Sequence, residues 1–253
     1  MSKHFYGRIK DTPDSRDFRF QPGYGLTPLP AIVDLRAYCP PVYDQLQANS
    51  CVGNAIAGGV DYERAHQGPE TPFMTPARLF IYYNARALEG TVDTDSGASI
   101  RDGFKSIKAQ GVCAEYRWPY IVPGNVTRKP FHGCYGAASW HKTLKYFALA
   151  QAQIDMMDCL AQGYPFVFGI TVYESFESEL VEKTGTVPMP KPGEAVIGGH
   201  ALLAVGYNQA SAEVLFRNSW GTEWGTAGYG TIPFAYLTNP DLASDLWTIR
   251  LEE

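Results

Sequence analysis

The stretch that decides the fold is Gln45-Leu-Gln-Ala-Asn-Ser-Cys51-Val-Gly-Asn-Ala-Ile-Ala-Gly-Gly-Val60. From Ser50 to His66 the apolar residues recur every three to four positions, which predicts a helix, and serine is a preferred residue at helix N-termini. Cys51 would then lie in the first turn, where the helix dipole lowers the pKa of a thiol and favours the reactive thiolate. Because an isolated cysteine is usually buried and inert, Cys51 needs partners elsewhere to be a nucleophile.

Two glutamines upstream of Cys51 are candidates for stabilising an oxyanion. Attack of a thiolate on a carbonyl group creates a negatively charged oxygen, and the Cys51 N–H together with a glutamine amide would supply hydrogen bonds to it. Gln45 and Gln47 are both close to Cys51 in sequence. Their spacing alone does not choose between them.

A partner for Cys51 is found in the C-terminal part of the chain. Two apolar runs, residues 198–207 and 214–217, are separated by polar residues 208–213, and this pattern predicts a β-hairpin. Its far ends would bring His200 and Asn218 together. A histidine that acts as a base needs its second ring nitrogen held by a fixed acceptor, and the carbonyl of an asparagine can do this.

The remaining patterns predict an α+β chain in two halves. Residues 1–28 are rich in proline, glycine and charge and predict an irregular N-terminal segment. We expect a mainly helical half over residues 29–125 and a β-rich half over residues 126–253, because predicted helices come first and predicted strands later. Outside the stretches above, the expected helices are 75–88, 99–110 and 151–161, and the expected strands are 141–149 and 164–172.

Composition and charge exclude several classes of function. The net charge is −5 and no basic block occurs, so nucleic acid is not an expected partner. No apolar run reaches the roughly 18 residues of a membrane span, and the first residues lack a secretory signal. The location stays open: secreted or periplasmic if a signal was removed, otherwise cytoplasmic. The chemistry above needs no cofactor, and no spacing typical of a zinc site is present.

The chain has five cysteines, an odd number. If disulfides form, at least one thiol is left over. The sequence does not rank the possible pairings of the four other than Cys51, which are Cys39, Cys113, Cys134 and Cys159.

Three ordered motifs together resemble the papain family of cysteine peptidases, and bacterial members more than plant or lysosomal ones. They are Gln45-x5-Cys51, Gly199-His200-Ala201 and Asn218-Ser-Trp-Gly-Thr-x-Trp-Gly225. The resemblance extends from Leu29 to Gly230. It implies a helical half and a β-barrel-like half, with a cleft between them that binds an extended peptide or protein substrate. It also implies that Gln45, and not Gln47, is the oxyanion glutamine.

The resemblance further implies which residues bind substrate. Gly97 and Ala98 would pair with the substrate main chain, and Ile100 would line the pocket for the second residue before the scissile bond. An apolar pocket wall there favours an apolar side chain. Gly199 and Trp220 complete the expected substrate-binding set.

Several positions depart from the family pattern near the nucleophile. Val52 stands where the family has an aromatic residue, and Asn49 and Ala98 stand where it has glycines. Ala48 and Asp95 together replace the two cysteines of the family's usual disulfide. Because none of these positions carries a catalytic atom, the departures bear on specificity more than on catalysis.

Three activities fit these residues. The first is peptide hydrolysis through an acyl-enzyme, with Cys51 as nucleophile and His200 as acid and base. The second is a silent papain-like binding protein, against which the presence of all four catalytic residues argues. The third is acyl transfer to an amine, which uses the same residues.

The N-terminal segment, residues 1–28, has two possible roles. It contains five aromatic residues, which a solvated tail would rarely need. One hypothesis is that it partly occludes the substrate groove and restrains activity. The alternative is that it packs on the back of the β-rich half as structural cover. The aromatic residues are Phe5, Tyr6, Phe18, Phe20 and Tyr24.

Overall fold

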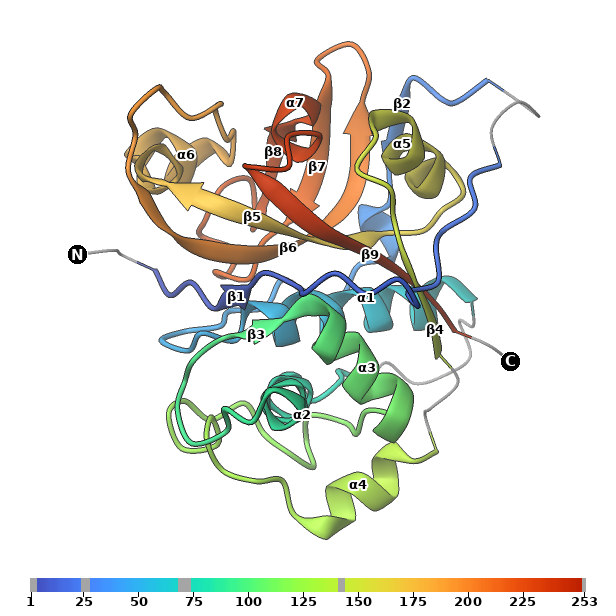
Figure 1. The fold of residues 1–253 in the computed structure, drawn as a ribbon, viewed down its shortest axis with the longest axis vertical. Coiled ribbons are helices and arrows are strands. Elements are labelled where there is room, and N and C mark those ends of the chain that lie inside the picture. Colours follow the sequence, from blue (N-terminus) through green and yellow to red (C-terminus); the bar gives the residue numbers. More distant parts are fainter. Residues whose placement is uncertain (1–3, 24–27, 68–73, 141–143, 252–253) are drawn as a thin grey trace.

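The computed structural model describes residues 4–23, 28–67, 74–140 and 144–251. A layer of helices lies against a layer dominated by an antiparallel sheet (Figure 1). This confirms the predicted α+β fold class. The helical layer contains α1 (Cys51–Gln67), α2 (Arg78–Glu89), α3 (Ile100–Gln110) and α4 (His132–Ala138).

The sheet has the strand order β4-β9-β5-β6-β7-β8, and a short strand, β2 (Ile32–Asp34), also pairs with β6. All of its strand pairs are antiparallel. Short helices α5 (Gln153–Ala161), α6 (Glu179–Thr184) and α7 (Phe234–Leu237) accompany it. The strands are β4 (Leu144–Ala148), β5 (Phe166–Tyr173), β6 (Val196–Asn208), β7 (Glu213–Arg217), β8 (Tyr229–Pro233) and β9 (Ala243–Leu251).

Helix α1 lies at the junction of the two layers, and its residues 51–63 are all buried. Its tandem glycines let it pack closely on the sheet. A methyl group at Gly58 would touch the side chains of Leu203 and Arg217 at 3.4 Å. The space between the helix and strands β6 and β7 is therefore about the size of one methyl group at this position.

The local signals for α3 predicted its bounds well. The Ser99 side chain accepts a hydrogen bond from the Asp102 amide, and Gly111 follows the last turn. Helix α2 begins at Arg78, three residues later than expected from Thr75. Pro76 instead forms an isolated β-bridge with Ala114, and this tertiary contact explains why the helix starts later than expected.

The predicted hairpin is formed by β6 and β7, with Asn208 opposite Glu213. Strand β6 is longer than expected, because it begins at Val196 to pair with β5. His200 is therefore inside a strand, opposite Ile170, while Asn218 comes directly after β7. The expected strand 141–149 is found as β4 from Leu144, and residues 141–143 lie outside the described residues.

The described part of the N-terminal segment runs between the two layers (Figure 1). Its strand β1 (Arg8–Ile9) pairs in parallel with β3 (Ala98–Ser99), which immediately precedes α3. Farther along, the backbone of Phe18 and Phe20 bonds to Ala148 of β4. Tyr24, one of the five aromatic residues singled out in the sequence, lies outside the described residues.

The two short 3-10 helices are η1 (Arg36–Tyr38) and η2 (Glu174–Glu177). Among the described residues, no helix has the length and apolar character to cross a bilayer.

Candidate active site

Cys51 is the first residue of α1 and is fully buried. Ser50 precedes it, and the Ser50 hydroxyl bonds to the Tyr120 hydroxyl (2.6 Å) and the Asn54 amide (3.1 Å). Burial raises the pKa of the Cys51 thiol above its ordinary value, while hydrogen bonds from the backbone of Ala201, Gly7 and Val52 oppose that rise. Since Ala201 follows His200, the sulfur lies beside the strand that carries the predicted base.

The His200 ring is held by Asn218. His200 Nε2 lies 2.9 Å from Asn218 Oδ1, and the same oxygen accepts the backbone N–H of Ser219 at 2.8 Å. A backbone N–H can only donate, so the atom of Asn218 that faces it must be the oxygen. Neutral His200 therefore carries its proton on Nε2, which leaves Nδ1 with a lone pair.

His200 Nδ1 is buried and has no hydrogen-bond partner among the described residues. The ring stacks on Trp220, with centroids 4.8 Å apart, and Phe176 and Trp224 pack around Trp220. Burial lowers the pKa of His200 to about 4, although the hydrogen bond to Asn218 opposes this change. Near neutral pH, this burial therefore favours a neutral thiol and a neutral imidazole in the covered site.

Gln45 is fully buried, whereas Gln47 is exposed. The Gln45 Oε1 atom accepts the Ser219 hydroxyl at 2.6 Å, which fixes the amide so that Nε2 points the other way. Nε2 donates to the Ala48 carbonyl (2.8 Å) and to the carbonyl of Phe5 (3.1 Å). A carbonyl oxygen of the N-terminal segment thus occupies a position where a Gln45 donor can stabilise negative charge.

The loop before α3 is held close to the start of α1. Asn49 donates to Asp95 through its backbone (3.0 Å to Oδ2) and its side chain (2.7 Å to the carbonyl). The Tyr82 hydroxyl donates to Asp95 at 2.6 Å and accepts the Gly97 N–H at 2.9 Å. These hydrogen bonds join the two segments that a disulfide joins in the resembling family, where this chain has Ala48 and Asp95.

Residues 4–9, which we call the cleft segment, cover the site. His4 stacks on Trp220 at 3.8 Å between centroids, and the Tyr6 ring lies edge-on to His200 at 5.8 Å. Gly7 reaches Cys51, and its carbonyl accepts the Ala98 N–H at 2.7 Å. The Tyr6 hydroxyl also donates to Glu177 Oε1 at 2.8 Å.

Two glycines of the groove wall lie very close to the backbone of the cleft segment. A Cβ added at Gly97 would lie 2.2 Å from the Gly7 carbonyl oxygen, and one at Gly199 would lie 2.5 Å from the Arg8 carbonyl oxygen. Gly97 also has φ +83°, which other residues rarely adopt. The groove therefore accommodates a main chain at close range, whatever its side chains.

Of the expected substrate-binding residues, Gly97, Ala98, Gly199 and Trp220 all contact the cleft segment. Ile100 is fully buried and belongs to the apolar cluster of the helical layer, so its role as a pocket wall stays a prediction. Sequence reasoning missed Ser219, which orients both Gln45 and Asn218. Its position directly after Asn218 in the third motif was the available signal.

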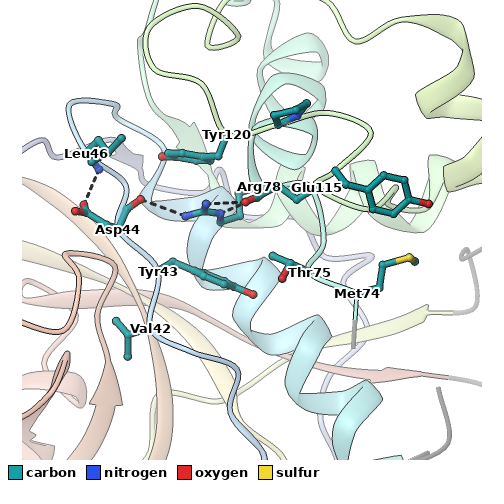
Figure 2. Close-up of a pocket in the computed structure, with 11 residues that line it drawn as sticks. Val42, Tyr43, Asp44, Leu46, Met74, Thr75, Arg78, Glu115 and Tyr120 are labelled. Carbon is teal, nitrogen blue, oxygen red and sulfur yellow. Dashed lines mark hydrogen bonds and ion pairs between the residues drawn. The ribbon is translucent and has the colours of Figure 1, made fainter. Parts of the chain in front are cut away.

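An open pocket of about 880 Å³ lies beside the segment that carries Gln45, and Arg78 is at its centre (Figure 2). Arg78 pairs with Glu115 at 2.8 Å, donates to Asn54 Oδ1 at 3.0 Å, and lies between the rings of Tyr43 and Tyr120. Cys51 is not among the lining residues. The pocket is therefore separate from the cleft, and Arg78 braces the start of α1 through Asn54.

The five cysteines are all free thiols in the structure. Cys113 and Cys134 are hydrogen bonded to each other, and burial raises the pKa of Cys113 to about 12. Burial also raises the pKa of Cys39 and of Cys159 to about 11. No group of three or more histidine, cysteine or acidic side chains is placed to hold a metal ion within the described ranges.

Comparison with known proteins gives one consistent result. The family model described as papain family cysteine protease matches residues 29–237. An uncharacterized peptidase C1-like protein of Acanthamoeba polyphaga mimivirus is 38% identical over 99% of this chain and 88% of its own length. Procathepsin L of Felis catus is 25% identical over 79% of this chain, which spans 60% of that protein.

Two solved structures illustrate the likeness of fold. Xylellain, a cysteine protease from Xylella fastidiosa, superposes with a TM-score of 0.91 at 40% identity, covering 98% of this chain and 96% of that one. Digestive procathepsin L 3 of Tenebrio molitor has a TM-score of 0.71 at 20% identity, and the superposition covers 93% of this chain and 75% of that one.

Proposed function

The chain belongs to the papain family of cysteine proteases and is a cysteine peptidase, and we propose that Cys51 is its nucleophile, His200 its acid and base, and Asn218 the residue that orients His200. The observation that carries this assignment is the His200–Asn218 hydrogen bond. Because Ser219 fixes the Asn218 oxygen, Nδ1 of His200 remains free to accept the proton of a thiol.

The reaction then follows from these positions. His200 Nδ1 takes the Cys51 proton, and the sulfur attacks the carbonyl carbon of the scissile bond. The Cys51 N–H and Gln45 Nε2 donate to the oxyanion, as Gln45 now donates to the Phe5 carbonyl. The His200 imidazolium gives its proton to the leaving amine, and His200 then deprotonates the water that hydrolyses the thioester.

The same geometry supports a restraint on activity by the cleft segment. His4 lies at Trp220, Gly7 at Cys51 and Arg8 at Ala98, and β1 pairs with β3 in parallel. A substrate whose residues before the scissile bond pair with Ala98 would have its leaving group toward Trp220. The cleft segment therefore runs opposite to such a substrate, so it fills the groove without presenting a productive peptide bond.

Contacts of the residues that follow the cleft segment hold it in place. Arg101 bonds to Thr12 and Asp17, and the Trp247 indole donates to Asp11 at 2.8 Å. Gly23 donates to Asp158 on α5 at 2.9 Å. Both roles considered for the N-terminal segment are thus supported, by different parts of it: its first residues fill the groove, and later ones cover the sheet.

The test compares full-length protein with a chain that starts at Leu29. Iodoacetamide should alkylate Cys51 faster in the shorter protein at mildly acidic pH, and His200→Ala should abolish that fast labelling. Hydrolysis of a fluorogenic peptide should show the same dependence. Labelling at the rate of a free thiol in a folded, truncated protein would contradict the Cys51–His200 assignment. Unchanged kinetics on truncation would leave the segment as structural cover.

A further inference from the structure

One hydroxyl group joins the two ends of the segment that carries both proposed oxyanion donors. We call residues 45–51 the donor segment, because it begins with the Gln45 amide and ends with the Cys51 N–H. The Tyr120 hydroxyl donates to the Gln45 carbonyl at 2.9 Å and bonds to the Ser50 hydroxyl at 2.6 Å. Tyr120 lies 75 residues beyond Gln45 in the chain, so a distant element links the two ends of the donor segment.

The directions of these hydrogen bonds follow from what each group can donate. A tyrosine hydroxyl has one proton, and Tyr120 gives it to the Gln45 carbonyl, which can only accept. The Ser50 hydroxyl must therefore donate to the Tyr120 oxygen. The Ser50 oxygen in turn accepts the Asn54 amide at 3.1 Å, and Asn54 Oδ1 accepts Arg78 at 3.0 Å. The chain of hydrogen bonds thus runs in one direction and ends at the Gln45 carbonyl.

The surroundings hold the Tyr120 side chain in this position. Its ring forms part of the wall of the open pocket, and the Arg78 guanidinium lies over it at 3.8 Å from the centroid (Figure 2). The three residues whose polar groups meet its hydroxyl, Gln45, Ser50 and Asn54, are fully buried. Hydrogen bonds among buried groups are stronger than those in water. Tyr120→Phe would remove this hydroxyl and leave the contact between the ring and Arg78 in place.

The backbone of the donor segment needs such a restraint. Leu46 has φ +51°, a left-handed conformation that residues with a Cβ rarely adopt. Its side chain is 53% exposed, so packing of that side chain contributes little to holding the conformation. Strained backbone persists only where the surrounding structure holds it. Hydrogen bonds do so at the preceding residue: Tyr120 bonds to the Gln45 carbonyl, and the Ser219 carbonyl accepts the Gln45 N–H at 2.8 Å.

Resting on the proposed function, we infer that Tyr120 is a positioning residue for the oxyanion, whose hydroxyl fixes Gln45 Nε2 and the Cys51 N–H relative to each other. Two donors stabilise one developing charge only if both point at the place where it forms. This charge exists in the transition state and not in the bound substrate, so the hydroxyl should act on kcat and not on KM. Iodoacetamide alkylation displaces iodide at a saturated carbon and forms no oxyanion, so its rate should not depend on Tyr120.

The test compares Tyr120→Phe with the parent protein as full chains. With saturating peptide, kcat should fall about 3- to 10-fold, the scale of one hydrogen bond, while KM and the rate of Cys51 alkylation stay within about 2-fold. The matched control is Tyr135→Phe, which removes a hydroxyl that donates to Asn84 Oδ1 at 3.1 Å, between α4 and α2. Its kcat, KM and alkylation rate should all equal those of the parent.

A double-mutant cycle shows whether Tyr120 acts through Gln45. Gln45→Ala alone should lower kcat about 10²-fold. Adding Tyr120→Phe to Gln45→Ala should lower kcat by less than about 2-fold more, because the donor that the hydroxyl positions is already gone. A purely structural loss would instead be the same in both backgrounds.

Equal kcat in Tyr120→Phe and Tyr135→Phe would overturn the inference, and so would losses that add fully in the double variant. A fall in alkylation as large as the fall in kcat would also overturn it, because the hydroxyl would then support the Cys51–His200 pair and not the oxyanion. If Gln45→Ala lowers kcat and Tyr120→Phe does not, the oxyanion role of Gln45 stands and the inference alone fails. Normal kcat in Gln45→Ala would reject that role, and the inference with it.

Discussion

Replacing Gly7 with alanine adds one methyl group at the tightest point of the cleft. The new Cβ would lie 1.8 Å from the Asn49 carbonyl oxygen and 2.6 Å from the Asn49 Cβ. This is about 1.5 Å short of ordinary van der Waals contact. Asn49 cannot yield easily, because its backbone and side chain are both hydrogen bonded to Asp95. The cleft segment must therefore move.

The size of the effect follows from the cost of overpacking, typically ~1–3 kcal/mol. If that cost falls on the covered state alone, the ratio of open to covered protein rises roughly 5- to 150-fold. The entropic gain of Gly→Ala through the unfolded chain, about 0.4–1 kcal/mol, acts on overall folding and is smaller. We expect Cys51 alkylation and peptide hydrolysis in full-length Gly7→Ala protein to rise by a factor in that range.

The matched control lies in the same N-terminal segment. Within the described part of the chain, a Cβ at Gly23 meets only Gln162 Nε2, at an ordinary 3.5 Å, so Gly23→Ala should leave both rates unchanged. The assay follows alkylation of Cys51 by peptide mapping, because four other thiols are present. A Gly7→Ala protein that melts normally and reacts no faster than Gly23→Ala would refute the occlusion.

The same comparison has a pH signature. In the covered protein, burial raises the pKa of Cys51 and lowers that of His200 to about 4, so neither is charged near neutrality. Alkylation in the covered protein should then rise only above the ordinary thiol range. Opening the cleft admits water and removes part of this burial, so Gly7→Ala protein should already react at mildly acidic pH, through a thiolate–imidazolium pair.

Three further changes probe the site and its support. Asn218→Ala should lower kcat, but less than His200→Ala, because it disturbs the orientation of the base and leaves the base in place; equal losses would count against the pairing. Gln45→Ala should lower kcat about 10²-fold, the scale of one oxyanion donor, and a Gln47→Ala control should have little effect. Arg78→Ala should reduce the free energy of unfolding by ~3–5 kcal/mol in denaturant titration, because it leaves Glu115 unpaired in a mostly buried site. Arg16→Ala, which breaks the exposed pair with Asp14, should leave that energy essentially unchanged.

Local signals in the sequence were enough for the parts of the site that sequence neighbours determine. The helix that begins at Cys51, the capped helix after Ser99 and the hairpin between His200 and Asn218 follow from periodicity and turn residues. The His200–Asn218 contact then follows from hairpin geometry alone.

Non-local contacts were out of reach of those signals. Residues 8 and 9 pair with residues 98 and 99. A strand of two residues is too short to show the alternating apolar pattern from which strands are predicted. Arg8 pairs with Asp245 where β9 bulges against β5, a register shift that depends on both strands. Pro76 is likewise outside helix α2 because of a non-local contact, its β-bridge with Ala114 far along the chain.

If Cys51 is the nucleophile of peptide hydrolysis, blocking its sulfur must stop the reaction. The most direct measurement titrates the protein with a peptidyl epoxide, maps the modified cysteine by mass spectrometry and records residual hydrolysis at each point. Hydrolysis should fall in proportion to modification of Cys51 and reach zero at one equivalent per active site, and Cys51→Ala protein should lose at least ~10⁴-fold in activity without losing its fold. Hydrolysis that persists with Cys51 fully modified, or in pure Cys51→Ala protein, would contradict the assignment.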